Sequence, residues 1–201
     1  MSSEPRDPWS DLPGWLVILS GPSGVGKSTI ARRLLERMAG RLTASISVTT
    51  RPPRGGERTG VDYVFVTPDQ FQAMKGDLLE SATVHGHEYG TPAQPARQAM
   101  SEGRCVLLVI DVQGGLQVMS KISRTVSIFV EPPSLEELET RLKTRRTEDE
   151  AALARRLTNA RAELAIKNQY HYQVINDDLD RTVEELASIL SRCGSSQGTT
   201  R

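Results

Sequence analysis

Short apolar runs alternate with amphipathic segments along most of the chain. Apolar residues predominate in the runs at 15–19, 105–110 and 126–130. Runs of this length that are bounded by glycine or proline are typical of strands buried on both faces of a sheet. The run at 172–176 looks like a last strand near the end of the chain. The pattern therefore predicts three buried strands and this last one.

The segments between these runs have apolar residues at helical spacing. The first begins after Lys27 and ends at Gly40, with an apolar face made of Ile30, Leu34, Leu35 and Met38. Capping-box patterns predict helix starts at Ser134, with Glu137 three residues later, and at Thr147, with Glu150. A last helix ends near Gly194, and its apolar positions are Val183, Leu186 and Leu190.

Strands that alternate with helices imply an α/β fold, in which helices cover both faces of a mostly parallel sheet. The stretch 45–91 breaks this alternation. It contains turn signals at Pro52-Pro53 and Gly55-Gly56, and polar and apolar residues alternate around 62–66. We therefore expect a small, largely antiparallel insertion within a single domain of 201 residues.

Composition excludes several classes of partner. The formal net charge is zero and aromatic residues are only 4% of the chain, so we expect no nucleic acid as partner. No apolar run approaches the ~20 residues that a membrane span needs. Cys105 and Cys193 lie far apart in the sequence, so neither a disulfide framework nor a zinc knuckle is suggested. These features favour a cytoplasmic protein.

The nine residues "GPSGVGKST", at 21–29, lie between the first strand and the first helix. They match the pattern G-x-x-x-x-G-K-S of a phosphate-binding loop, a P-loop, in the strand–turn–helix context that the motif requires. Backbone N–H groups and the helix N-terminus hold the phosphates of a nucleoside triphosphate there. Lys27 then reaches the β- and γ-phosphates, and Ser28 binds Mg²⁺. A turn without a ligand is the alternative interpretation.

Two further groups are candidates for the site. Asp111 follows the strand at 105–110, where a carboxylate can hold Mg²⁺ or its waters or can face a second substrate. Arg51 and Arg54 flank a rigid Pro-Pro, and their planar guanidinium groups can bind one phosphate through paired hydrogen bonds. Tyr63 and Tyr89 add hydroxyl donors. Solvated arginines in a polar loop and an ordinary strand-end aspartate remain the alternatives.

Several ordered motifs together resemble the guanylate kinase family over roughly residues 15–190. They are "SGPSGVGKST", "TTRPPRGGERTGVDYVFV", "GHEYGTP", "IDVQGG", "EPPSLEELETRL" and "VINDDLD". The P-loop alone would indicate only a P-loop protein, whereas the whole set in this order is specific.

The resemblance implies a kinase that phosphorylates GMP with ATP and Mg²⁺. It implies a core at 14–46, 92–138 and 159–194, a GMP-binding insertion at 47–91 and a helical lid at 139–158. The ends at 1–13 and 195–201 are expected to be mobile from their polar, glycine- and proline-containing composition. ATP would be bound by Gly21, Pro22, Ser23, Gly24, Val25, Gly26, Lys27, Ser28 and Thr29. The GMP phosphate would be bound by Ser47, Arg51, Arg54, Tyr63 and Tyr89, and guanine by Glu80, Thr91 and Asp111.

Base chemistry agrees with the implied role of Glu80. Guanine presents N1–H and N2–H₂ as adjacent donors, which one carboxylate accepts together. Adenine has an acceptor at N1, so a buried carboxylate would face a lone pair at a cost of about 1–3 kcal/mol. Glu80 is therefore expected to select the base.

Arginines of the lid are candidates to stabilise the migrating phosphoryl group, together with Lys27 and Arg51. Arg141 and Arg145 are four residues apart and share a helix face, and Arg156 lies on the next helix. A solvated basic face is the alternative for each of them. Where the family has Arg-Gly-Thr, this chain has Arg145-Arg146-Thr147, so either arginine can be the one that points inward.

Two other departures and alternatives bear on function. The family often has an acid two residues before the aspartate, but this chain has Val109-Ile110-Asp111, so Mg²⁺ would rely more on Ser28 and phosphate oxygens.

His85 and His87 are expected to be part of a polar loop without a metal. A kinase-like module that binds phosphopeptides, and a kinase with another acceptor such as a ribose phosphate, are the competing hypotheses.

Overall fold

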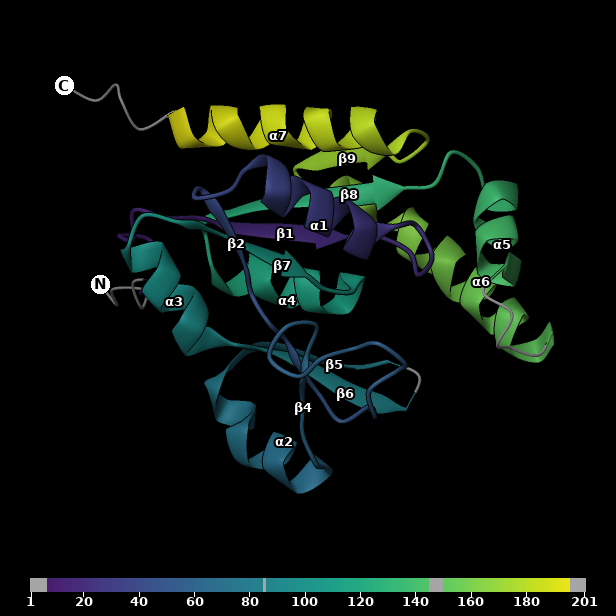
Figure 1. The fold of residues 1–201 in the computed structure, drawn as a ribbon, viewed down its shortest axis with the longest axis horizontal. Coiled ribbons are helices and arrows are strands. Elements are labelled where there is room, and N and C mark those ends of the chain that lie inside the picture. Colours follow the sequence, from purple (N-terminus) through teal and green to yellow (C-terminus); the bar gives the residue numbers. More distant parts are fainter. Residues whose placement is uncertain (1–6, 85, 145–149, 196–201) are drawn as a thin grey trace, which may run out of the picture. The chain divides into compact units, whose positions relative to one another are not determined.

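Strands alternate with helices along the chain, as the hydrophobic pattern predicts. The computed structural model describes residues 7–84, 86–144 and 150–195 (Figure 1). No helix within these ranges has the length and apolar character that crossing a bilayer requires. The elements are, in order, β1 (Leu16–Ser20), α1 (Lys27–Arg37), β2 (Leu42–Ala44), β3 (Val48–Thr49), β4 (Val64–Phe65), α2 (Pro68–Met74), η1 (Lys75–Asp77), β5 (Leu78–Val84), β6 (His87–Pro92), α3 (Ala93–Ser101), β7 (Cys105–Val109), α4 (Val112–Lys121), β8 (Thr125–Glu131), α5 (Leu135–Thr144), α6 (Glu150–Ala165), η2 (Lys167–Gln169), β9 (Tyr172–Ile175) and α7 (Leu179–Ser195).

The strands form two separate sheets. The larger has the order β2-β7-β1-β8-β9, and both β2 with β7 and β8 with β9 are parallel pairs. The smaller has the order β4-β3-β6-β5, in which β6 is antiparallel to β3 and to β5, and β3 is parallel to β4. The α/β fold with an inserted, largely antiparallel sheet is therefore confirmed.

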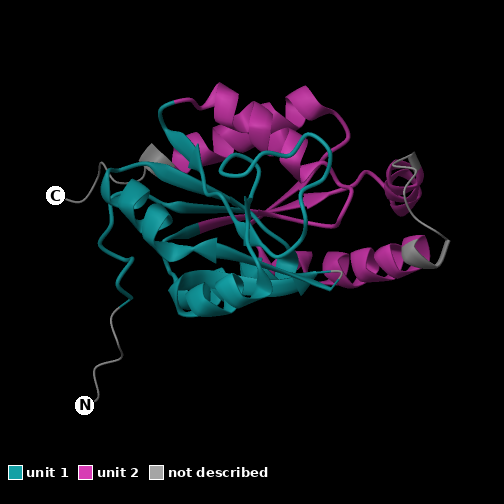
Figure 2. Cartoon of the chain, turned by 60° about the horizontal axis from the view of Figure 1, so that its bottom comes forward, with its two compact units in different colours: residues 1–18, 40–125 teal, residues 19–39, 126–201 magenta. Residues whose placement is uncertain are grey.

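Contacts divide the chain into two units (Figure 2). The first unit contains residues 1–18 and 40–125, and the second contains residues 19–39 and 126–201. The P-loop and both helices of the expected lid belong to the second unit, whereas the expected GMP-binding insertion belongs to the first. The core, insertion and lid boundaries given above stay a prediction.

In the second unit, α1 and α7 lie side by side (Figure 1). Their apolar faces are buried, with Ile30 and Leu34 of α1 and Leu186 of α7 fully inaccessible. An ion pair with a distance of 2.8 Å joins Arg37 Nε to Glu184 Oε1 at the exposed margin of the helices. Exposed pairs contribute only about 0–1 kcal/mol, so apolar burial accounts for most of the stability of this packing.

In the first unit, residues 7–13 make specific contacts that the expectation of a mobile N-terminal segment did not include. Trp9 is buried, and Arg124 Nε donates to the Gly14 carbonyl over 2.9 Å. The Arg124 guanidinium also lies 4.6 Å from the centre of the Trp15 ring. This arginine therefore ties the segment before β1 to the segment before β8.

A helix inside the insertion was not expected from the sequence. It is α2, which begins after Thr67 with a complete capping box and a proline in its first turn. Thr67 Oγ1 accepts from the Gln70 backbone N–H over 3.2 Å, and Gln70 Oε1 accepts from the Thr67 N–H over 2.9 Å. Phe71 on this helix is fully buried. The signal was present in the sequence as T-P-D-Q, so the helix start was predictable.

Candidate active site

The P-loop lies in the second unit, between the end of β1 and the start of α1. Gly26 precedes α1 with φ = 103°, a left-handed backbone conformation that residues other than glycine rarely adopt. A Cβ atom on Gly26 would also lie 2.7 Å from Asn176 Nδ2. Both the backbone conformation and the neighbouring side chain therefore require glycine here.

Lys27 folds back over the loop that it follows. Its Nζ donates to the Gly21 carbonyl over 2.6 Å and to the Pro22 carbonyl over 3.0 Å. The next two residues, Ser28 and Thr29, are exposed in the first turn of α1. The ammonium and the Ser28 hydroxyl are thus both carried by the N-terminal turn of a helix, whose dipole favours negative charge.

Asn176 supports the P-loop from the end of β9. Its side chain is 8% exposed, and its Nδ2 donates to the Val25 carbonyl over 2.8 Å. Its Oδ1 accepts from Thr182 Oγ1 over 3.3 Å, so both ends of the amide have partners. Sequence analysis assigned this residue no role. The signal was a polar residue directly after an apolar strand of a parallel sheet.

Two of the three lid arginines lie near this loop in the second unit. Arg156 Nη2 donates to Ser23 Oγ of the P-loop over 2.8 Å. Arg141 Nε donates to Glu137 Oε1 over 3.1 Å, and its Nη2 donates to the Asn176 carbonyl over 3.2 Å. The predicted residue Arg145 lies outside the described residues, as do Arg146 and Thr147.

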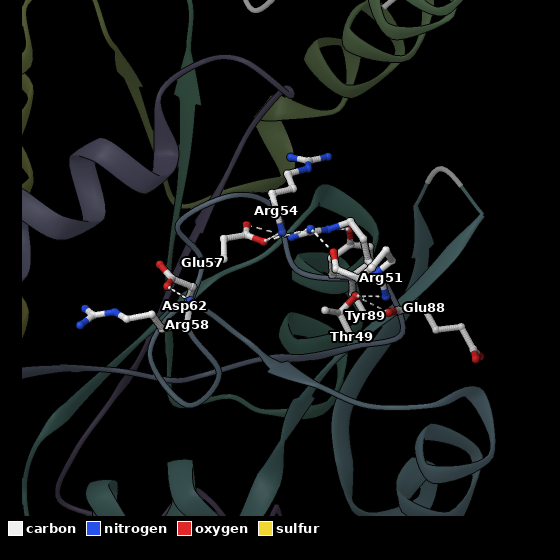
Figure 3. Close-up of polar contacts among 9 residues, drawn as sticks. Thr49, Arg51, Arg54, Glu57, Arg58, Asp62, Glu88 and Tyr89 are labelled. Carbon is white, nitrogen blue, oxygen red and sulfur yellow. Dashed lines mark hydrogen bonds and ion pairs between the residues drawn. The ribbon is translucent and has the colours of Figure 1, made fainter. Parts of the chain in front are cut away.

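In the first unit, Arg51 is the centre of a polar cluster (Figure 3). Its side chain is only 8% exposed and donates to Glu57 through two parallel hydrogen bonds of 3.0 Å. Its Nε donates to Tyr89 Oη over 3.1 Å, and its Nη1 also donates to the Pro52 carbonyl over 2.7 Å. The hydrogen bonds from Arg51 hold the pKa of the Glu57 carboxyl below its usual value, so Glu57 is charged.

The arrangement of Arg51 changes how the two arginines can bind a phosphate. A guanidinium has five N–H groups, and the hydrogen bonds to Glu57, Tyr89 and Pro52 use four of them. Arg54 is exposed, and Figure 3 shows its guanidinium directed away from the Glu57 carboxylate. Arg54 is therefore the arginine that can present a paired donor set to an anion without first releasing Glu57.

Two tyrosines complete this cluster. The Tyr63 ring lies 5.9 Å from the Tyr89 ring in an edge-on arrangement, and the Arg51 guanidinium lies 5.5 Å from the Tyr63 ring centre. Burial raises the pKa of the Tyr63 hydroxyl, so this group remains a neutral donor. The predicted phosphate residues Arg51, Tyr63 and Tyr89 are thus brought together.

The predicted base-reading residues form a second cluster in the first unit. Glu80 on β5 is 4% exposed, and its Oε1 accepts from Thr91 Oγ1 on β6 over 2.6 Å. Thr91 is fully buried and lies 3.5 Å from the hydroxyl of Ser47. Since β5 and β6 pair with Glu80 opposite Thr91, this contact follows from strand register.

Burial raises the pKa of Glu80 to about 7, against the opposing effect of the Thr91 hydrogen bond. The negative charge of Asp111 raises this pKa further, and the positive charge of Lys121 lowers it. Asp111 caps α4 through a 2.8 Å hydrogen bond that its Oδ1 accepts from the Gly114 N–H. A Cβ on Gly114 would lie 2.5 Å from Glu80 Oε2, so the helix and the carboxylate approach closely.

Comparison with known proteins assigns the family. The guanylate kinase family model matches residues 14–193. A guanylate kinase of Thermosynechococcus vestitus is 46% identical over 180 residues, 89% of this chain and 94% of the relative. One of a Mycobacterium species is 48% identical over 88% of this chain and 91% of the relative. The chain belongs to the guanylate kinase family.

A solved structure supports the same assignment. The crystal structure of guanylate kinase from Anaplasma phagocytophilum aligns with a TM-score of 0.75 at 34% identity, over 93% of this chain and 88% of that one. The family resemblance and the α/β fold derived from the sequence are therefore confirmed. The roles of individual residues stay predictions.

The donor set of this guanylate kinase fits Mg²⁺ held mainly by its nucleotide. Among the described residues there is no group of three or more His, Cys, Asp or Glu side chains that could bind a metal ion. His87 lies in the β5–β6 hairpin opposite Val84, and His85 is outside the described residues. The exposed Ser28 hydroxyl is a suitable single ligand, because Mg²⁺ commonly keeps waters and phosphate oxygens as its other ligands.

Glu57 is the second residue of the site that sequence analysis missed. It lies within the quoted motif but was not separated from the surrounding charges. Its signal is an acid three residues after Arg54, a position from which its Oε2 accepts the Arg54 backbone N–H over 2.7 Å. The pairing with Arg51 depends on the shape of the whole loop and has no local sequence signature.

Proposed function

We propose that this chain transfers the γ-phosphoryl group of ATP to GMP and produces ADP and GDP. The observation that carries the proposal is the buried Glu80 carboxylate, hydrogen-bonded to Thr91, in a chain of the guanylate kinase family. A buried carboxylate is costly unless its oxygens are hydrogen-bonded or paired. Guanine supplies two adjacent N–H donors that satisfy its oxygens.

The P-loop is proposed to bind the ATP phosphates. Main-chain N–H groups before α1 surround the β-phosphate, and Lys27 exchanges its bonds to the Gly21 and Pro22 carbonyls for phosphate oxygens. Ser28 holds Mg²⁺ together with the phosphates. When bound, this ion neutralises charge on the β- and γ-phosphate oxygens.

The Arg51 cluster is proposed to bind the GMP phosphate. Tyr63, Tyr89 and Ser47 each donate a hydroxyl hydrogen bond to the phosphate. Arg54 supplies the paired N–H donors, because the corresponding pair of Arg51 is already bonded to Glu57. Arg51 contributes its remaining N–H and its charge. In this proposal, Glu57 limits how far Arg51 can turn, so the phosphate is held in one orientation for in-line attack.

Guanine is proposed to bind against Glu80 and Thr91, with Asp111 as a further acceptor. Only the ionised form of Glu80 accepts from both N1–H and N2–H₂. Adenine has an acceptor at N1 and therefore opposes the carboxylate. This contrast is the basis of the expected preference for GMP over AMP.

Arg141, Arg145 and Arg156 are proposed to surround the transferred phosphoryl group. The migrating group needs mainly positive charge and orientation, which arginine side chains provide. Arg156, through its bond to Ser23, already lies next to the P-loop. Closure of the helices that carry these arginines would also exclude water, which otherwise competes with GMP for the γ-phosphate.

The remaining properties follow from the same proposal. GMP and ATP are the partners, and nucleic acid is not. A reduced, cytoplasmic setting agrees with Cys105 and Cys193, neither of which forms a disulfide in the described part of the chain.

A coupled assay of ADP release over GMP, AMP, CMP and UMP tests the proposal. We expect GMP to be preferred by a factor of about a hundred, which corresponds to the upper end of the roughly 1–3 kcal/mol that one unsatisfied buried polar group costs. Equal or greater rates with another monophosphate reject the base assignment. Phosphopeptide binding without ATP turnover would instead support the binding-module alternative.

A further inference from the structure

One face of α4 holds the edge strand β5 on both sides of Glu80. Asp111, Gly114, Gln117 and Lys121 are spaced by three, three and four residues, so they lie along one side of the helix. α4 and β5 lie against each other in the first unit. We refer to these four positions as the α4 face.

Gln117 acts as a substitute strand partner for β5. Its Oε1 accepts from the Ser81 backbone N–H over 3.2 Å, and its Nε2 donates to the Ser81 carbonyl over 2.9 Å. β5 is the outermost strand of its sheet, so no further strand lies beyond Ser81 to make these bonds. One carboxamide thus satisfies both main-chain groups of the residue next to Glu80.

Lys121 holds the other side of Glu80. The pairing of β5 with β6 is regular from Glu80 onward but shifts between Leu78 and Glu80, as at a β-bulge. Lys121 Nζ donates to the carbonyl of Leu79, the residue within this irregularity, over 3.3 Å. A bulge changes the direction in which the next side chain points. The bond from Lys121 therefore holds the backbone at the place where the direction of Glu80 is set.

The N-terminal part of the α4 face meets the carboxylate itself. The absence of a side chain at Gly114 leaves the space that Glu80 occupies, and Asp111 places a second negative charge nearby. From the other side, Thr91 on β6 donates to Glu80 through its hydroxyl. The position of the carboxylate therefore depends on the backbone of β5 and on α4 as well as on Thr91.

We propose that Gln117 and Lys121 are positioning residues for base selection, which hold the β5 backbone at Ser81 and Leu79 so that Glu80 faces the guanine site. This inference rests on the proposed function, because it assumes that Glu80 contacts the base. Neither residue touches the nucleotide in this arrangement. Their effect is exerted through the geometry of Glu80.

Gln117→Met is the decisive variant, because methionine keeps the length of the side chain and removes both hydrogen bonds. We expect the KM for GMP to rise about tenfold, which corresponds to about 1.4 kcal/mol from two neutral hydrogen bonds. The KM for ATP and the kcat at saturating GMP should change less than twofold. The preference for GMP over AMP should fall by a similar factor, and Gln98→Met, at an exposed position of α3, is the matched control.

Lys121→Met tests the second contact, with Lys75→Met in the exposed η1 turn as its control. We expect a severalfold higher KM for GMP. The inflection in the pH dependence of this KM should also move to higher pH, because the positive charge that favours ionised Glu80 is lost. A lysine that only stabilised the fold would not move this inflection.

Glu80→Gln separates failure of this inference from failure of the proposed function. If Glu80→Gln leaves the GMP-to-AMP preference unchanged, the assignment of the guanine site is wrong. If it abolishes the preference while Gln117→Met behaves like the wild type, only the positioning role is rejected. A Gln117→Met variant that unfolds, or that raises the KM for ATP as much as that for GMP, shows a structural role and overturns the inference.

Discussion

In the proposed function, the P-loop and the insertion at 47–91 would bind anions by different means. The P-loop would use backbone N–H groups before α1, one lysine and the conformation of Gly26. The insertion would use side chains that are themselves paired, as in the contacts of Arg51 with Glu57 and of Glu80 with Thr91. A backbone site depends on a short stretch of chain, whereas a side-chain site depends on several strands being in register. The two regions should therefore respond differently to substitution.

The largest effect is expected at the one cationic side chain of the P-loop. Lys27→Ala should lower kcat about a hundred- to a thousandfold, because the transferred phosphoryl group loses a charged donor. Coupled assay of ADP release gives the rate. Circular dichroism should be unchanged, since the Lys27 ammonium bonds to the Gly21 and Pro22 carbonyls of its own loop. Loss of helix in this variant, with Lys75→Ala unaffected, would mean that the lysine is structural.

Arg51→Lys should have the next largest effect and should act on the insertion alone. Lysine has no planar pair of donors and so cannot bond Glu57, Tyr89 and Pro52 together. We expect kcat/KM for GMP to fall about a hundredfold, which is the equivalent of one or two charge-assisted hydrogen bonds. The KM for ATP should stay within twofold. Arg58→Lys, at an exposed position of the same loop, is the control, and an unchanged KM for GMP in Arg51→Lys would contradict the assignment.

The pH dependence of GMP binding tests the carboxylate of the insertion. Burial raises the pKa of Glu80 to about 7, and only the ionised form accepts both guanine donors. The KM for GMP should therefore rise about tenfold between about pH 8 and pH 6. The phosphate of GMP titrates near 6 as well, so Glu80→Gln in the same buffers is needed to isolate the carboxylate. Identical profiles for the two proteins would argue against ionised Glu80 as the acceptor.

The same pKa gives a stability prediction with a defined sign. Glu80 binds its proton more tightly in the folded chain, where its pKa is about 7, than in the unfolded chain, where a glutamate has its ordinary pKa of 4.5. Its contribution to stability is therefore fully present below about pH 4.5 and decreases as pH rises through 7. Glu80→Gln should gain thermal stability relative to the wild type as pH increases over this range. A constant difference in Tm would contradict the raised pKa.

The smallest effect on activity is expected at Asn176, whose side chain bonds the P-loop backbone. Asn176→Ala leaves the Val25 carbonyl without its amide donor, which should lower the free energy of unfolding by about 1–3 kcal/mol. The KM for ATP should rise only about threefold, because the backbone conformation of the loop is largely local. Thermal unfolding measures the change in stability, and the coupled assay measures the KM for ATP. Asn168→Ala, at an exposed position, is the control, and a larger change in the KM for GMP than for ATP would contradict the comparison.

The elements that the sequence predicted well are those with local causes. The helix after Lys27 and the strands at 105–110 and 126–130 follow from periodicity and flanking residues, and the structure has them as α1, β7 and β8. The strand ends are shifted by no more than one residue, and the helix ends at Arg37 instead of Gly40. The helix α2 also has a local cause in its capping box and was missed because turn signals dominated the stretch around it. The sheet order could not be predicted in this way, since it is a matter of long-range pairing.

The candidate site residues also divide into those with a local sequence signal and those that depend on tertiary packing. Lys27 and Ser28 were identifiable from spacing alone, because a P-loop is one continuous stretch. Glu80 was assigned only through the order of motifs, since an isolated glutamate in a strand carries no signal. Asn176 and Gln117 were missed, because each bonds a partner whose identity depends on how distant segments pack. Glu57 was missed because its pairing with Arg51 depends on the shape of their common loop.

The sequence by itself determined the class of fold, the P-loop and the family, because these depend on periodicity, on contiguous residues and on the order of motifs. Only the tertiary structure decided that Arg51 is already paired with Glu57, that Glu80 is buried with a raised pKa, and that α4 holds β5 on both sides of it. The physical reason is that burial and hydrogen-bond partnership are properties of an environment. That environment is assembled from segments far apart in the chain.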